Sequence, residues 1–367
     1  MSRYTCRVVS TLAAVLLSLS VQADTFLDPL DRPALKTERA QSSLMLSTAK
    51  AGDRLVAVGE YGRIIISNDD GGTWQQVSSP VSVDLVSVSF PTDAMGWASG
   101  HAGVILHSAD GGMTWEKQID GREVETLMRD YYQQRLEAGD ESVESLLRDV
   151  ELNFQNGPEL PFLGVWFRNE LEGFAVGGFG MILSTRDGGK NWTPWLDRID
   201  NPDVLHLNAV NGVDDDVFIA GERGVVWKLD SESRRFIARQ TGYAGSFFGV
   251  TGDASNVIAF GLRGNAYRST DEGDNWHSLS LPTRASINGA VLSPEGILAL
   301  VTQSGHVVVG DINNLDFTAS RVRRPALLTS VVPVDYQTIV VAGTNGMQRE
   351  TLSADLRQSP QADEEKR

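Results

Sequence analysis

A short glycine motif repeats along almost the whole chain and constrains the fold more than any other feature. Two glycines separated by two residues follow a short apolar run, beginning at Gly59, Gly100, Gly177, Gly221, Gly261 and Gly343. A further copy ends at Gly305 and has Thr302 at its first position. Successive copies lie 40 to 44 residues apart, except for one interval of 77 residues between Gly100 and Gly177. This spacing predicts seven equivalent units, with an insertion in the long interval.

Each unit has the pattern of several short strands. Apolar runs of four to six residues precede and follow the glycine motif, as at 85–90, 55–58 and 163–167, and Gly, Pro, Asp or Asn bounds them. Such runs are typical of strands. Four short strands in about 40 residues form one blade of a β-propeller. We therefore predict an all-β chain folded as a seven-bladed β-propeller, in preference to a β-sandwich or a solenoid.

A second motif follows the glycine motif in units 1, 2, 3 and 5. It has the form Ser/Thr-x-Asp-x-Gly-x-x-Trp, known as the Asp-box or BNR repeat. Its members are Asp69, Gly71, Trp74; Asp110, Gly112, Trp115; Asp187, Gly189, Trp192; and Asp271, Gly273, Trp276. The motif predicts a hairpin turn in which the carboxylate accepts backbone N–H groups, glycine adopts a positive φ and tryptophan packs over the turn. These residues are interpreted as structural.

Units 4 and 6 lack the Asp-box but retain an aromatic residue at the tryptophan position, Phe236 and Phe317. Unit 7 has neither feature, so its outer strand must come from elsewhere if the ring is to close without an open edge. The segment 25–41 precedes the first inner strand. We predict that this segment supplies the missing strand of blade 7.

The insertion between blades 2 and 3, residues 120–157, has a helical pattern. Asp120 and Glu123 form a capping box, and Val124, Leu127, Met128 and Tyr131 recur at helical spacing. Gly139 is placed to end this helix. A second helix is expected from Asp140, with an apolar face of Val143, Leu146, Leu147, Val150 and Phe154. Two interpretations remain open: a hairpin packed on the rim of the ring, or a docking arm or lid.

The glycine loops form the predicted binding surface. In a propeller of this topology, the loop between the second and third strands shares a face with the connection between blades, so these loops and the insertion lie together, opposite the Asp-boxes. The expected mouth residues are Glu60, Tyr61, His101, Phe179, Glu222, Arg223, Leu262, Arg263, Gln303 and Asn345. Variable polar and aromatic side chains on equivalent turns are typical of a recognition surface. Solvated loop tips are the alternative interpretation.

The N-terminus predicts export. Arg3 and Arg7 precede an apolar stretch, and Ala23 ends a segment suited to signal-peptide cleavage. We expect a signal peptide at 1–23, the propeller at 24–358 and a disordered polar tail at 359–367, in a periplasmic, secreted or lumenal protein. The formal net charge of the whole chain is −16, which argues against a nucleic-acid partner. The single cysteine, Cys6, lies in the predicted signal.

No motif for catalysis, metal or cofactor binding accompanies the repeats. The five histidines show no metal-ligand spacing, and nucleophile-elbow and phosphate-loop motifs are missing from the sequence. Because Asp-boxes occur in sialidases, a sialidase-like glycosidase is the alternative function. Its candidate groups are Arg63, Arg223, Arg263, Glu222 and either Tyr61 or Tyr243.

The stretch from Gly173 to Trp192 joins Gly177, Gly180, Asp187 and Gly189 in one pattern, which closely resembles the photosystem II stability/assembly factor family. The resemblance runs over about 44–358, without the insertion. It implies a seven-bladed propeller that binds a membrane-protein precursor without catalysing a reaction, in the lumen or periplasm. Similar chains occur in non-photosynthetic bacteria, where a role beside envelope transport systems is implied. We expect a monomer without metal or cofactor, whose partner is a protein of a membrane-embedded complex.

Overall fold

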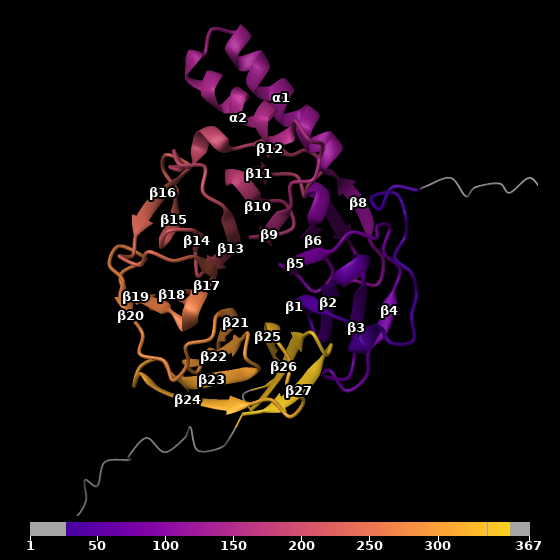
Figure 1. Cartoon of the computed structure of the whole chain (residues 1–367), viewed down its shortest axis with the longest axis vertical. Coiled ribbons are helices and arrows are strands. Elements are labelled where there is room, and N and C mark those ends of the chain that lie inside the picture. The colour runs from indigo at the N-terminus through magenta and orange to yellow at the C-terminus, as the bar shows by residue number, and fades with distance from the viewer. Residues whose placement is uncertain (1–26, 336, 353–367) are drawn as a thin grey trace, which may run out of the picture.

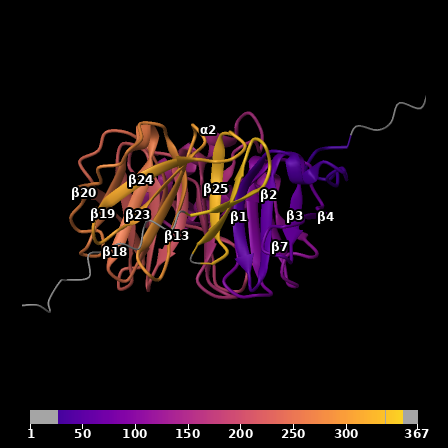
Figure 2. The ribbon, with the colours of Figure 1, turned by 90° about the horizontal axis from the view of Figure 1, so that it is seen from below.

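Seven antiparallel sheets surround a central axis in the computed structural model, which describes residues 27–335 and 337–352 (Figure 1). Each sheet is a blade whose strands follow one another in sequence from the axis outward. The strands run between the two faces of a flattened ring (Figure 2). The prediction of a seven-bladed β-propeller is confirmed.

The first four blades hold sixteen strands. Blade 1 contains β1 (Met45–Ala51), β2 (Arg54–Gly59), β3 (Ile64–Ser67) and β4 (Gln75–Val77). Blade 2 contains β5 (Leu85–Ser89), β6 (Gly96–Gly100), β7 (Ile105–Ser108) and β8 (Glu116–Ile119). Blade 3 contains β9 (Phe162–Phe167), β10 (Gly173–Gly177), β11 (Ile182–Thr185) and β12 (Thr193–Pro194). Blade 4 contains β13 (Leu207–Val213), β14 (Asp216–Gly221), β15 (Val225–Asp230) and β16 (Arg235–Gln240).

The remaining blades complete the ring. Blade 5 contains β17 (Phe247–Asp253), β18 (Asn256–Gly261), β19 (Ala266–Ser269) and β20 (His277–Ser278). Blade 6 contains β21 (Ile287–Leu292), β22 (Ile297–Thr302), β23 (His306–Asp311) and β24 (Asp316–Arg321). Blade 7 contains β25 (Leu328–Pro333), β26 (Thr338–Gly343) and β27 (Gln348–Thr351). The helices are α1 (Gly121–Glu137) and α2 (Glu144–Phe154), with 3-10 turns η1 (Ala40–Ser42), η2 (Glu60–Gly62), η3 (His101–Gly103), η4 (Glu141–Val143), η5 (Gly178–Gly180), η6 (Leu196–Arg198) and η7 (Leu262–Gly264).

The core lies between neighbouring blades. Trp97 of blade 2 is fully buried and stacks on Phe167 of blade 3, with ring centroids 3.6 Å apart. Phe236, which replaces the Asp-box tryptophan in blade 4, is also fully buried. Burial of such aromatic side chains stabilises the fold by several kcal/mol each. Neighbouring blades are therefore joined by apolar layers, to which the repeats contribute their buried side chains.

The four Asp-boxes form the predicted turns. In blade 1, Asp69 Oδ1 accepts the Ser67 hydroxyl and the Thr73 N–H, both at 2.8 Å, and Trp74 donates its indole N–H to the Gly71 carbonyl at 3.2 Å. The other three boxes repeat the carboxylate contacts. In blade 3, however, the indole Nε1 of Trp192 is buried and has no partner among the described residues.

The insertion forms the predicted helical hairpin. Asp120 accepts the Arg122 N–H while Glu123 accepts the Asp120 N–H, so the capping box caps α1. Gly139, with φ of 93°, follows its C-terminus. The buried faces of α1 and α2 join Trp97 and Trp192 in one apolar cluster between blades 2 and 3. The hairpin extends outward from the ring (Figure 1), which favours the interpretation of a hairpin packed on the rim.

The predicted closure of blade 7 is wrong for the described part of 25–41. The sheet of blade 7 has three strands, and residues 27–41 form no strand in it. They form a strap along the outside of blades 2 and 1, with Leu30 buried against that side and the Ala34 N–H bonded to the Ser79 carbonyl. The end of the strap reaches blade 7 at Gln41, whose carbonyl accepts the Met347 N–H at 3.1 Å.

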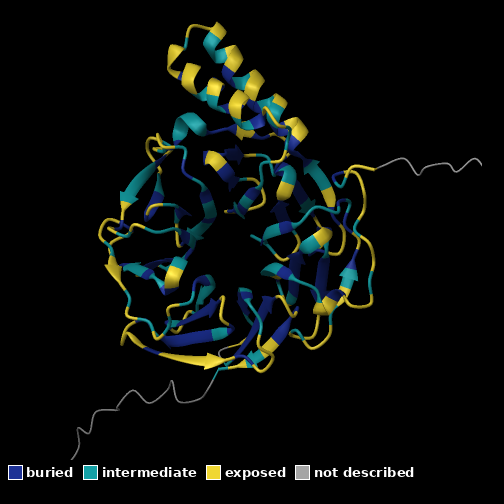
Figure 3. Cartoon of the chain, in the orientation of Figure 1, coloured by how far each residue is buried: buried dark blue, intermediate teal, exposed yellow. Residues whose placement is uncertain are grey.

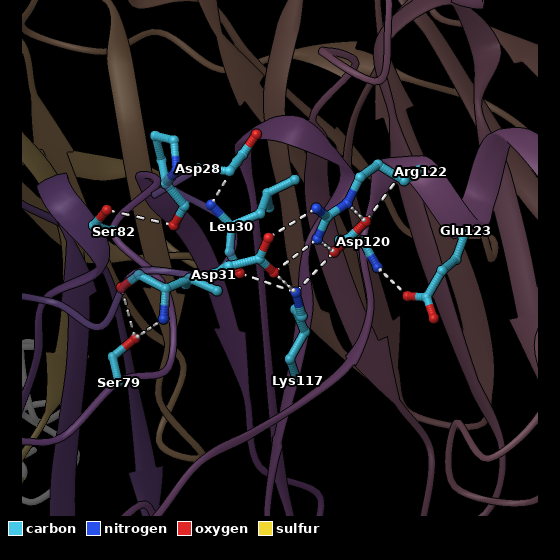
Figure 4. A network of polar contacts seen from close by, with 11 residues as sticks. Asp28, Leu30, Asp31, Ser79, Ser82, Lys117, Asp120, Arg122 and Glu123 are labelled. Carbon is cyan, nitrogen blue, oxygen red and sulfur yellow. Dashed lines mark hydrogen bonds and ion pairs between the residues drawn. The ribbon is translucent and has the colours of Figure 1, made fainter. Parts of the chain in front are cut away.

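A polar network fixes the start of the strap (Figure 4). Lys117 of β8 donates to the Leu30 carbonyl and to the carboxylates of Asp31 and Asp120. Arg122 of α1 also binds both carboxylates. These contacts hold the start of the strap at blade 2.

The predicted signal peptide at 1–23 and polar tail at 359–367 lie outside the described residues. Both helices longer than one turn, α1 and α2, are too short or too polar to cross a bilayer, as are the other helices of the described residues.

Candidate functional site

The glycine motifs build a tight turn at the mouth of the ring in each blade. A side chain at the first glycine would clash with backbone: a Cβ at Gly100 would lie 2.1 Å from the Asp84 carbonyl oxygen. The last glycine needs a positive φ, which is 66° at Gly103. Gly103 also lies against Gly121 at the start of α1. This contact confirms that the mouth loops and the insertion share a face.

In five of the seven turns a non-glycine residue adopts the left-handed conformation at the third position, whereas Ser304 and Asn345 in blades 6 and 7 do not. The φ angles are 55° at Tyr61, 52° at Phe179, 52° at Arg223 and 58° at Arg263. This region is unfavourable for residues with a Cβ, by about 1 kcal/mol or more. The turns therefore fix the direction in which the Cα–Cβ bond of each of these residues leaves the backbone, because the first and last glycines constrain the turn.

Two aromatic side chains are exposed to solvent at the mouth. Tyr61 is 61% exposed and Phe179 is 46% exposed. The guanidinium of Arg63 lies 5.4 Å from the Tyr61 ring centroid, and Phe179 rests on the His206 ring at 4.7 Å. Most large apolar side chains are instead buried inside the blades, and exposed residues gather in the loops and on the outer side of the hairpin (Figure 3).

The other predicted mouth residues divide into two groups. His101, Arg263 and Gln303 are exposed. Glu222, Arg223 and Asn345 hold neighbouring loops. Glu222 accepts the His206 N–H at 2.9 Å, Arg223 pairs with Asp203 at 2.7 Å, and Asn345 donates to the Pro325 carbonyl at 2.8 Å. Glu60 and Leu262 complete the ten predicted mouth residues, all of which lie on the mouth loops. The side chains of four of the ten bind a local partner, since Glu60 also pairs with Arg63.

The candidate glycosidase groups are not brought together. Arg63 pairs with Glu60 and Arg223 with Asp203, each within its own part of the ring. The Tyr243 hydroxyl donates to the Leu262 carbonyl. Blades 1 and 4, which carry Arg63 and Arg223, lie on different sides of the ring (Figure 1). An arginine triad that holds one substrate carboxylate is therefore not formed by these residues.

The central channel is lined by the inner strands, and its polar side chains bind neighbouring blades. The cavity there has a volume of about 260 Å³. Ser47 accepts the Val88 N–H, and Asn208 donates to the Phe247 carbonyl at 2.8 Å. These groups join one blade to the next. Among residues 27–335 and 337–352, no three His, Cys, Asp or Glu side chains gather as a metal site.

A pocket between blades 3 and 4, on the Asp-box face, is indicated by no motif of the sequence. Its volume is about 320 Å³. Arg168 lies over the Trp166 ring at 5.7 Å, and Arg234 lies over the Trp195 ring at 5.8 Å. Burial, together with the charge of Arg186, lowers the pKa of Arg234 from its ordinary value. Only the fold could show this pocket, because its residues come from separate hairpins without a shared motif.

The chain matches the family model described as "Photosynthesis system II assembly factor YCF48" over residues 34–124 and 140–310. The "Photosystem II assembly protein Ycf48" of Thermosynechococcus vestitus is 33% identical over 75 residues, which are 19% of this chain and 22% of that protein. The "Photosystem II stability/assembly factor HCF136, chloroplastic" of Arabidopsis thaliana is 42% identical over 65 residues, 17% of this chain and 16% of that protein. The matches thus span about a fifth of these relatives' length.

Similar solved structures share the fold. "YCF48 bound to D1 peptide" has a TM-score of 0.60 at 14% identity and covers 88% of this chain and 99% of that one. "YCF48 from Cyanidioschyzon merolae" has a TM-score of 0.59 at 14% identity, covering 88% and 98%. The WD40 propeller domain of Doa1 has a TM-score of 0.60 at 10% identity, covering 88% and 95%. Because the family model matches well over half of the residues, the chain belongs to the Ycf48 family of photosystem II assembly factors.

Proposed function

We propose that this protein is a non-enzymatic assembly or stability factor that binds a protein of a membrane-embedded complex through its mouth loops. Family membership supports the assembly role, and a structure of the same fold holds a D1 peptide. The observation that carries the choice of surface is the pair of exposed aromatic side chains, Tyr61 and Phe179, held on left-handed turns.

Such residues suit a binding surface for energetic reasons. Aromatic side chains dominate the free energy of many protein interfaces because they bury a large area with few rotatable bonds. A fixed turn lowers the conformational entropy lost on binding. His101 and Arg263 add exposed polar groups on neighbouring mouth loops, which supply specificity at the rim of such a contact.

We also propose that the protein acts after export, as a monomer. The apolar N-terminal stretch before Ala23 supports export. A seven-bladed ring completes its own core within one chain, because each blade packs on two neighbours. The partner is proposed to be a membrane-embedded complex, in keeping with the family.

The test is site-specific crosslinking in solubilised membranes. A photo-crosslinking amino acid replaces Tyr61 or Phe179, and the matched control replaces Leu171, which is 57% exposed on the opposite face. We expect one dominant membrane protein to crosslink at positions 61 and 179 and not at 171. The double variant Tyr61→Ala, Phe179→Ala should retain its melting temperature and capture that protein about tenfold less well. Equal capture, or crosslinks at 171 alone, would reject the mouth as the binding surface.

A further inference from the structure

We propose that the outer edge of β27 is a docking site for an extended acidic segment of a protein partner, which pairs with β27 as the fourth strand of blade 7. The other six blades have four strands, whereas blade 7 has three in the described residues. The site lies on the outer perimeter of the ring and uses none of the proposed mouth residues. It therefore goes beyond the proposed function, and the two can fail separately.

The outward-facing groups of β27 follow from its pairing. Gln348 and Glu350 lie opposite Val341 and Ile339 of β26, and the Leu352 N–H donates to the Gln337 carbonyl. Because backbone groups alternate between the two sides of a strand, Met347, Arg349 and Thr351 direct theirs away from β26. The Met347 N–H is already bonded to the Gln41 carbonyl, so a fourth strand would pair with the outward groups of Arg349 and Thr351.

Arginine side chains, rather than a strand, bind the outward carbonyls. Arg324 Nη2 donates to the Met347 carbonyl at 2.9 Å, and Arg323 Nη2 donates to the Arg349 carbonyl. The guanidinium groups thus take the positions of the N–H donors of a fourth strand. Among the described residues, the outward N–H groups of Arg349 and Thr351 have no acceptor. The edge is only partly covered, and exposed edges of this kind pair readily with extended segments.

Space for a strand is present beside the edge. A cavity of about 370 Å³ separates β27 from the Asp-box turn of blade 1. It is lined by Gln41, Gly71, Gly72, Arg323, Arg324 and residues 347–350. The strap closes one end of this cavity through the bond between Gln41 and Met347. The cavity thus lies on the outward side of β27, between this strand and the neighbouring blade.

The charge beside the β27 edge indicates which kind of segment would bind there. Three exposed arginines line the cavity beside the edge: Arg323, Arg324 and Arg349. Their only ion pair in the described residues joins Arg323 and Glu350 at 3.6 Å. In a chain with a net charge of −16, this local positive charge favours a carboxylate-bearing segment. It disfavours pairing with the same edge of a second copy, because the arginines of the two edges would repel each other.

The experiment measures binding of a fluorescein-labelled peptide of about eight alternating Glu and Thr residues to the full chain by anisotropy. One control peptide has Lys in place of Glu, and a second carries N-methyl groups on alternate backbone nitrogens. We expect the acidic peptide to bind and each control to bind about tenfold or more weakly. Hydrogen exchange at residues 347–351 should slow when the acidic peptide is added. Equal binding of the N-methylated peptide would show attraction by charge alone and would overturn strand pairing.

Variants locate the site. Arg349→Pro removes an outward N–H and a positive charge, whereas Arg349→Gln removes the charge alone. We expect the proline variant to bind about tenfold less well and the glutamine variant about threefold less well. If the proline variant does not fold, the N-methylated peptide and hydrogen exchange still decide the question. Unchanged binding by the double variant Tyr61→Ala, Phe179→Ala would keep this site distinct from the mouth. A peptide that binds only a chain shortened to end at Leu352 would identify residues 353–367 as the occupant and overturn the proposal of a partner strand.

Discussion

Arg122 binds Asp31 through two parallel hydrogen bonds, Nη1 to Oδ2 and Nη2 to Oδ1, both 2.9 Å long. The two residues are 91 positions apart and join the strap to the first turn of α1. Such bidentate pairs between arginine and carboxylate are geometrically specific. Hydrogen bonds from Arg122 and Lys117 hold the pKa of Asp31 far below its usual range. The network thus ties together the strap, blade 2 and the insertion.

Replacing Asp31 with Asn should release the strap without unfolding the ring. The substitution removes the charge that Arg122 and Lys117 share, while Asp120 still binds both. We expect faster hydrogen exchange in residues 27–44 and unchanged exchange in the inner strands. Glu38→Gln is the matched control, since Glu38 lies on the same strap and is exposed. Equal exchange in the two variants would show that the ion pair does not hold the strap.

The Asp-box carboxylates should make stability fall at acid pH. Hydrogen bonds lower the pKa of both Asp69 and Asp271 to about 2. The largest contribution comes from the Thr73 N–H for Asp69 and from the Asn275 side chain for Asp271. An unfolded aspartate has a pKa of about 3.9. Stabilisation by these groups is therefore present above about pH 4 and is lost as the pH falls towards 2.

Thermal melts between pH 5 and pH 2 test this expectation. Asp271→Asn should melt with a shallower dependence on pH than the unchanged protein, because one of the depressed carboxyl groups no longer titrates. Asp53→Asn is the control, since Asp53 is exposed and makes no side-chain hydrogen bond among the described residues. A slope reduced equally by both substitutions would contradict the role of the Asp-box.

Trp115→Ala should destabilise the ring by about 3–5 kcal/mol. Trp115 is 8% exposed, packs edge-on against Phe90 and donates its indole N–H to the Gly112 carbonyl at 3.0 Å. Arg263→Ala should change the free energy of unfolding by less than about 0.5 kcal/mol, because Arg263 is exposed on the mouth. Denaturant unfolding of the two variants measures both values. Similar losses would contradict the assignment of one residue to the core and the other to a surface.

The repeat made most of the fold predictable, because the glycine and Asp-box motifs are local and recur in every blade or most blades. Gly100 and Gly103, for example, are required because a Cβ at either position would collide with nearby backbone atoms. The helical hairpin was predictable for the same reason, since the capping box of Asp120 and Glu123 lies within one turn.

The strap and the edge of β27 could not be predicted in this way. The contact between Asp31 and Arg122 joins single residues far apart in the sequence, and neither belongs to a repeat. Arg323 and Arg324, which cover β27, come from the connection before β25 and belong to neither repeated motif. The pocket beside Trp195 likewise depends on how two hairpins from different blades meet. Long-range contacts without periodicity leave no local pattern.

The apolar face of α1 was also not fully predictable, because Tyr132 is buried there and its neighbour Tyr131 is not. The spacing placed Tyr131 on the apolar face of the insertion, and Tyr131 is only partly buried, whereas Tyr132 is fully buried. Its hydroxyl accepts the Leu196 N–H at 2.9 Å and donates to Asp197 Oδ1 at 3.2 Å. Burial, and then the charge of Asp197, raise the pKa of Tyr132 well above its usual value. The hydroxyl therefore stays protonated and joins α1 to η6 of blade 3.

Tyr132→Phe should accordingly loosen the insertion at blade 3. The variant keeps the aromatic ring in the apolar cluster but leaves the Leu196 N–H without its acceptor. Among the described residues, Arg135 is then the remaining partner of the Asp197 carboxylate. We expect a loss of about 1–3 kcal/mol in the free energy of unfolding, with faster hydrogen exchange at residues 194–198. Tyr131→Phe is the matched control, because the Tyr131 hydroxyl makes no hydrogen bond among the described residues. A loss of the same size in both variants would mean that aromatic packing, and not the Tyr132 hydroxyl, holds the hairpin against blade 3.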